Sequence, residues 1–180
     1  MCEYCGCQQV AAIGELTREH DAVVAEIAEV RTFLRDHDVD GAAKTARRIT
    51  EILQPHTAVE EHGLFPAMTE EFPDHVDALE REHRVVEAVL AEAATVTPTD
   101  PTWPQRLLAA LDLLREHILK EQDGMFPASL TVLDTEAWER VEAVRRRVGS
   151  AIGPEHTAYE HDHEHDHHHH GPDPDQEDHA

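Results

Sequence analysis

Two stretches of this chain repeat one another, and each joins an imidazole to a carboxylate. Residues 56–67 read His-Thr-Ala-Val-Glu-Glu-His-Gly-Leu-Phe-Pro-Ala, and residues 117–128 read His-Ile-Leu-Lys-Glu-Gln-Asp-Gly-Met-Phe-Pro-Ala. On a helix, residues four apart lie one above the other on the same face, so each stretch places a His beside a Glu. Gly and Pro follow in both stretches, which predicts that each helix ends there.

A second pair of matching stretches lies upstream. Residues 16–20 read Leu-Thr-Arg-Glu-His, and residues 79–83 read Leu-Glu-Arg-Glu-His. The spacing between the copies also agrees, since His83 follows His20 by 63 residues and His117 follows His56 by 61. The chain therefore contains a duplicated helix pair, and each copy carries one His followed by one His-x-x-x-Glu.

The apolar residues around these motifs recur in steps of three and four, as they do in helices that face the core of a bundle. We expect an all-α fold with helices at about 10–35, 41–63, 73–96 and 104–121, and a shorter fifth helix at about 134–152. The fifth helix is predicted to bury Trp138, Val141 and Val148, and to expose three consecutive arginines, Arg145, Arg146 and Arg147.

Six ionisable residues fall on the apolar faces of these helices: His20, His56, Glu60, His83, His117 and Glu121. A lone His on an apolar face is usually a hydrogen-bonded core residue, but six in two matched copies favour a shared role. Each buried polar group without a partner costs about 1–3 kcal/mol. Two metal ions would resolve this, with two imidazoles each and both carboxylates bridging. One more bridging oxygen would leave one octahedral position open on each ion. Such nitrogen and oxygen donors suit iron, and they tolerate manganese or zinc.

The order His, His-x-x-x-Glu, His, His-x-x-x-Glu on successive helices resembles the hemerythrin-like (HHE cation-binding) domain family, over roughly residues 12–130. The resemblance implies an up-down-up-down four-helix bundle around a non-haem di-iron centre with an oxo or hydroxo bridge. It implies that the six residues are the iron ligands, and that the centre meets O2, peroxide or nitric oxide.

Two positions depart from the oxygen-carrying members of that family. Leu79 stands where they have a further His, and Gln122 stands where they have an Asp, while Glu121 offers its carboxylate instead. These departures favour the bacterial branch of redox, nitric-oxide and iron-handling proteins. A ferritin-like site would need paired Glu-x-x-His motifs, and the helical part of the chain has this spacing once, at Glu80 and His83.

Two functions remain open on the sequence alone. The first is binding of a small oxidant (O2, peroxide or nitric oxide) in oxidative or nitrosative stress defence. The alternative is storage, delivery or sensing of iron or another metal without turnover. The sequence does not decide whether the protein is an enzyme. His62 could serve as a proton relay or support the site from outside the ligand face, but the favoured interpretation is a solvated His at a helix end. His75 is interpreted as exposed.

The sequence divides into a Cys-rich segment (1–9), the helical bundle (10–152) and a His- and acid-rich tail (153–180). Cys2, Cys5 and Cys7 are too few and too close for a disulfide framework. They suit a metal ligand set or a redox pair with a resolving thiol, or they have no fixed role. The tail lacks an apolar period and is predicted to be disordered, with imidazoles that could bind nickel, zinc or copper.

The net charge of −23 argues against nucleic acid or an anionic membrane as a partner. No apolar run is long enough to span a bilayer, and the first residues lack the apolar region of a signal peptide. We therefore expect a cytoplasmic protein.

Overall fold

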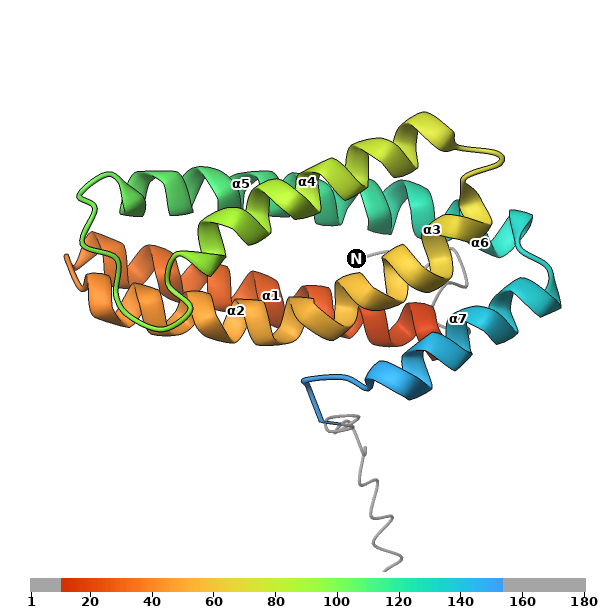
Figure 1. Cartoon of the computed structure of the whole chain (residues 1–180), viewed down its shortest axis with the longest axis horizontal. Helices are drawn as coiled ribbons and strands as arrows, with labels where there is room; N and C mark the ends of the chain where they lie inside the picture. Colours follow the sequence, from red (N-terminus) through yellow and green to blue (C-terminus); the bar gives the residue numbers. More distant parts are fainter. Residues whose placement is uncertain (1–10, 154–180) are drawn as a thin grey trace, which may run out of the picture.

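The computed structural model describes residues 11–153, which contain helices and no strand. The predictions for Cys2, Cys5, Cys7 and the tail lie outside these residues. Neighbouring helices of the bundle are α1 and α2, α2 and α4, α4 and α5, and α5 and α1 (Figure 1). The predicted all-α bundle is thus confirmed. Its four long helices are α1 (Ala11–Arg35), α2 (Val39–Val59), α4 (Pro73–Ala91) and α5 (Trp103–Lys120).

The helix starts follow from local chemistry. The Asp38 side chain accepts a hydrogen bond from the backbone N–H of Gly41 at 2.8 Å, which satisfies a donor that the first turn of α2 leaves free. Pro73 opens α4, where its missing N–H costs nothing. Asp134 caps the fifth predicted helix, α7 (Thr135–Val148), through the N–H of Ala137.

The prediction that Gly and Pro end the two motif helices is wrong. Each motif glutamate begins one π-helical turn, η2 (Glu60–Leu64) or η3 (Glu121–Met125), and the helix then continues as α3 (Phe65–Met68) or α6 (Phe126–Val132). The N–H of Phe65 reaches back to the carbonyl of Glu60, and that of Phe126 to Glu121. A proline ring in an α-helix collides with the carbonyl four residues back. The wider π turn before each proline lets the helix continue.

The interior of the bundle consists of two apolar clusters. One contains Val30, Leu107 and Trp103, and the other contains Ile13 and Phe65. In α1, α2 and α4 the motif His falls between the parts of the helix that supply the two clusters. In α5 the core residues on both sides of His117 belong to the first cluster, and the second cluster is reached only beyond Glu121, at Met125 and Phe126. The core is therefore apolar at both ends and polar in the layer between them.

The fifth helix, α7 (blue in Figure 1), packs on η2, α2 and α1. Val141 is fully buried as predicted, whereas Trp138 and Val148 are only half-buried. Arg145 was expected in solvent, but it is 5% exposed. Gly63 allows the close approach of α7, because a Cβ atom there would lie 3.2 Å from the Cα of Val141.

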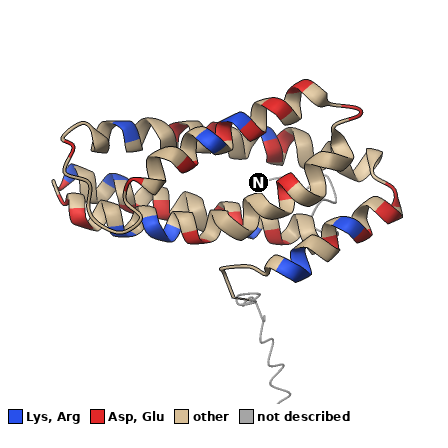
Figure 2. Ribbon diagram, viewed as in Figure 1, with Lys and Arg blue, Asp and Glu red and all other residues tan. Residues whose placement is uncertain are grey.

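Acidic and basic residues are interspersed on the four long helices and on α7 (Figure 2). None of the helices between residues 11 and 153 has the length and apolar character that crossing a membrane requires.

The two motif glycines provide a matched test of how α7 packs. A Cβ at Gly124 would meet nothing within 4 Å, so Gly124→Ala should raise the free energy of unfolding by about 0.5–1 kcal/mol through helix propensity. Gly63→Ala gains the same stabilisation from helix propensity, but its Cβ must push α7 away, at a cost of about 1–3 kcal/mol in the free energy of unfolding. We expect Gly63→Ala to be the less stable variant by at least about 1 kcal/mol in chemical denaturation of the metal-free proteins. Equal stabilities would contradict this packing.

Candidate metal centre

The six ionisable residues predicted from the sequence lie together in the polar layer of the bundle. None of their side chains is more than 6% exposed. Each residue comes from a different helical element: His20 from α1, His56 from α2, Glu60 from η2, His83 from α4, His117 from α5 and Glu121 from η3.

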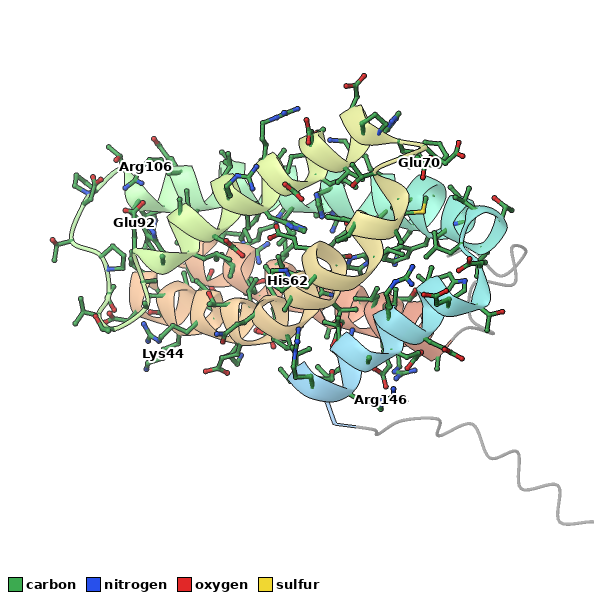
Figure 3. The ribbon with its side chains drawn as sticks, turned by 45° about the vertical axis from the view of Figure 1, so that its right-hand side comes forward. Lys44, His62, Glu70, Glu92, Arg106 and Arg146 are labelled. Atoms are coloured by element: carbon green, nitrogen blue, oxygen red, sulfur yellow. The ribbon has the colours of Figure 1, made fainter. Side chains whose placement is uncertain are left out.

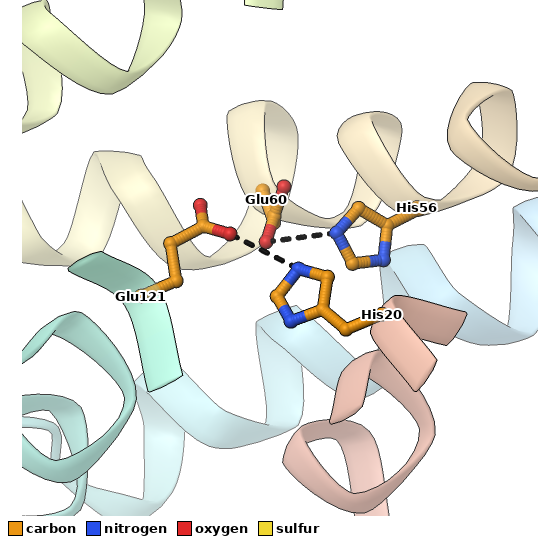
Figure 4. A group of neighbouring side chains, drawn as sticks. All are labelled: His20, His56, Glu60 and Glu121. Atoms are coloured by element: carbon orange, nitrogen blue, oxygen red, sulfur yellow. Dashed lines mark ion pairs between the residues drawn. The ribbon is translucent and has the colours of Figure 1, made fainter. Parts of the chain in front are cut away.

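Each of the two carboxylates lies between two imidazoles. Glu121 places Oε2 3.1 Å from His20 Nε2 and Oε1 3.1 Å from His117 Nε2. Glu60 places Oε1 3.3 Å from His56 Nε2 and Oε2 3.4 Å from His83 Nε2. Figure 4 shows His20 and His56 pointing at these carboxylates from two different helices. Each glutamate therefore contacts one imidazole from α1 or α2 and one imidazole from α4 or α5.

These contacts define two overlapping groups of donors. In each group one donor atom from every residue lies within 4.8 Å of all the others. The first position comprises His20 and His56 and the second His83 and His117, and both share Glu60 and Glu121. This is the arrangement that the duplicated motif predicts for two ions.

The donor atoms themselves fit a pair of cations. Both oxygens of Glu60, both oxygens of Glu121 and both ring nitrogens of His20 are buried without a hydrogen bond. The Nε2 atoms of His83 and His117 face one another at 2.9 Å. Each such group costs about 1–3 kcal/mol unless it finds a partner. Cations between the carboxylates and imidazoles would supply that partner, and the nitrogen and oxygen donors suit iron, manganese or zinc.

In the metal-free protein, protonated histidines neutralise the charge of the carboxylates. Burial disfavours the imidazolium of His56, but the negative charge of nearby Glu60 and the hydrogen bond with Glu19 outweigh burial and raise its pKa to about 10. The pKa of His83 rises to about 9 against the same burial, through Glu60 and Glu121. His20 behaves differently, because burial dominates and lowers its pKa.

Three further glutamates, which were not predicted from the sequence, contact the Nδ1 atoms of His56, His83 and His117. Nδ1 of His56 lies 2.9 Å from Glu19 Oε2, and Nδ1 of His117 lies 3.1 Å from Glu82 Oε2. Glu61 Oε1 lies 2.9 Å from Nδ1 of His83. When Nδ1 donates to a carboxylate, Nε2 turns its lone pair towards the cluster. For Glu19 and Glu82 the repeated Arg-Glu-His triplet was the available signal, because its Glu orients the His of the neighbouring helix. Glu61 lies outside this triplet.

Two phenylalanines cover the imidazoles on one side. Phe126 stacks on the ring of His20 at 5.5 Å between centroids, and Phe65 stacks on His83 at 5.8 Å. Each Phe belongs to one copy of the motif and covers a His of the other copy. Leu79 is buried in the apolar cluster on this side and brings no third imidazole.

The remaining histidines considered from the sequence stay outside the cluster. His62 is exposed, at the outer side of the helix that carries Glu60 (Figure 3). His75 is also exposed and makes an edge-on contact with Phe72.

A small cavity of about 10 Å³ adjoins the imidazoles. A groove of about 420 Å³ lies next to it and is lined by residues of α2, η2 and α4. Leu53, Thr57 and Glu87 line both spaces and so separate the groove from the imidazoles. Residues lining the cavity are His20, Leu53, His56, Thr57, His83, Val86, Glu87, Leu114 and His117.

Comparison with known proteins gave one family match. The model described as the hemerythrin HHE cation binding domain matches residues 11–129. Neither the curated proteins nor the solved structures gave a match. The matched residues include all six side chains of the cluster and end before α7 begins.

The raised pKa values of His56 and His83 predict how the stability of the metal-free protein depends on pH. Both values, about 10 and about 9, lie above the value of about 6.5 in an unfolded chain. Their protons therefore stabilise the fold fully below pH 6.5, and this stabilisation is lost as the pH rises through about 9 and 10. We expect the free energy of unfolding of the metal-free protein to fall by several kcal/mol between pH 7 and 10 in denaturant titrations. A flat profile would contradict the pairing of these imidazoles with the carboxylates.

Proposed function

The chain belongs to the hemerythrin HHE cation-binding domain family, and from this premise we propose that it is a non-haem di-iron protein that binds O2, peroxide or nitric oxide in oxidative or nitrosative stress defence. One observation carries the proposal. The carboxylates of Glu60 and Glu121 each reach both pairs of imidazoles, and their four oxygens have no hydrogen-bond partner.

The protein groups have distinct roles in this proposal. Two imidazoles would hold each iron, and the two carboxylates would be shared. When bound, iron would supply the redox chemistry with a small oxidant. Glu19, Glu61 and Glu82 orient the imidazoles through Nδ1. Phe65 and Phe126 exclude water from the side of the site that they cover.

The cavity supports a small ligand. Its volume of about 10 Å³ is close to the space that one water molecule needs, about 10–15 Å³ on the same measure. Leu53, Val86 and Leu114 make much of its wall apolar. A cavity of this size restricts the ligand to a very small molecule, and a larger substrate would have to displace side chains.

Leu79 bears on which small ligand is favoured. With an aliphatic side chain one turn before His83, the second position has no third imidazole from α4. A position that keeps room for a ligand favours reaction with peroxide or nitric oxide over reversible carriage of O2.

The alternative is storage, delivery or sensing of iron or another metal without turnover. The groove favours it in one respect, because Glu61 and Glu87 line the groove and Glu61 also contacts His83. These acids could guide a cation towards the cluster. Extra binding of nickel, zinc or copper by the tail belongs to the same proposal, and the tail lies outside the described residues.

Iron content tests the proposed centre. We expect the purified or reconstituted protein to hold about two irons per chain, measured by elemental analysis, since the donor set forms two overlapping sites. Glu60→Ala and Glu121→Ala should each lose iron, because each removes a donor from both positions. His75→Ala is the matched control, an exposed residue that should leave the content unchanged. One metal or fewer in well-folded unmodified protein would overturn the proposal.

The rate of oxidant consumption in variants of the cavity wall distinguishes turnover from storage. Leu53 lies between groove and cavity, so Leu53→Ala should enlarge the entrance and raise the rate of peroxide or nitric-oxide consumption severalfold at unchanged iron content. Gln54→Ala changes an exposed residue that lines the groove and not the cavity, and it should leave that rate unchanged. If unmodified protein and both variants consume neither oxidant yet release iron to a chelator, the alternative function is the correct one.

A further inference from the structure

The two metal positions are supported differently, and α7 makes the difference. This helix begins after the last residue of the family match. Val141 of α7 lies against Gly63 in η2, whereas Gly124 in the matching turn η3 has nothing within 4 Å of an added Cβ. The repeat in the sequence thus becomes unequal in the fold.

Glu19 connects α7 to the first position. Its side chain is fully buried, and each of its oxygens lies within hydrogen-bond distance of two polar atoms. Oε2 faces Nδ1 of His56 at 2.9 Å and accepts from Nη2 of Arg145 at 2.9 Å. Oε1 accepts from Nη1 of Arg145 at 2.8 Å and from Oγ of Ser150 at 2.6 Å.

Arg145 is itself held in a single orientation. Its Nη1 also donates to the carbonyl of Gly149 at 2.9 Å, and its Nε lies 3.1 Å from Glu15 Oε2. Glu15 and Glu19 are one turn apart on α1 and flank the guanidinium. A two-pronged Arg–carboxylate contact fixes geometry as well as charge. The carboxylate that faces His56 is therefore positioned by the fifth helix.

The equivalent carboxylate at the second position has no such support. Glu82 faces Nδ1 of His117 and pairs with Lys120, which lies on the same helix as His117. The Glu82 side chain is 16% exposed and that of Lys120 is 50% exposed. Exposed pairs of this kind contribute little and are screened by solvent. Nothing in this pair depends on α7.

We propose that Arg145 is a positioning residue for the first metal position: it fixes Glu19, Glu19 fixes the ring of His56, and α7 thereby sets how tightly this position holds its metal. The proposal rests on the proposed di-iron function. Groups that orient a metal-binding imidazole change metal affinity by about 10–100-fold when they are removed. Only one of the two positions should respond.

The test uses the full chain loaded anaerobically with Fe²⁺, and it follows iron release to a ferrous chelator. In Arg145→Gln we expect one of the two irons to leave about 10–100 times faster, and the other to leave at the unmodified rate. Arg146→Gln is the matched control, since Arg146 is exposed on the same helix (Figure 3) and should change neither rate. Glu82→Gln should accelerate the other iron, and the double variant with Arg145→Gln should accelerate both.

The following outcomes decide the question. Acceleration of a single iron in Arg145→Gln supports the proposal. Unchanged release, or equal acceleration of both irons, overturns it. If Arg145→Gln loses its helical circular dichroism, Ser150→Ala decides instead, because it removes one hydrogen bond to Glu19 and leaves the Arg145 pair in place. Faster release of one iron in Ser150→Ala then supports the proposal, and unchanged release overturns it. Unmodified protein that binds fewer than two irons would overturn the proposed function itself, which is a separate result.

Discussion

The burial of four imidazoles and two carboxylates at the centre of a small bundle is the constraint on which the other features depend. Apolar clusters at both ends of the bundle would pack without them, and the polar layer between the clusters interrupts that packing. Such groups are costly in an apolar interior unless each finds a partner. Protons can neutralise the carboxylates, and cations can also occupy the lone pairs that the protein leaves without hydrogen bonds. The fold and the candidate chemistry are therefore linked through the same six side chains.

Both copies of the repeat accommodate these buried polar groups with the same structural features. In both copies the motif Glu begins a π turn that lets the helix continue past a proline. In both copies a Phe stacks on an imidazole of the other copy, and a Glu next to one His orients the His on the adjacent helix. The copies are thus interlocked, because each one completes the surroundings of the other. A single copy would leave its imidazoles without the second carboxylate and without a covering ring.

The six side chains of the cluster could be predicted from the sequence, because helical spacing places each of them on the apolar face of its own helix. The π turns could not, because the rule that Gly and Pro end helices assumes α-helical geometry. The burial of Arg145 could not be predicted from the sequence either. Three consecutive arginines near a helix end are usually solvated, and Arg145 is buried only because Glu19, 126 residues earlier in the chain, needs a counter-charge. A long-range pair of this kind leaves no local pattern in the sequence.

The surroundings of the two positions differ more than their donors do. Nδ1 of His83 contacts Glu61 and that of His117 contacts Glu82, and both of these carboxylates are partly exposed, at 26% and 16%. Glu61 also lines the groove, so contacts run from the groove directly to the second position. Glu19 is buried, and its charge acts with little screening by solvent. Two positions with the same kinds of donors thus have different electrostatic surroundings, because one is enclosed by a fifth helix and the other borders a groove.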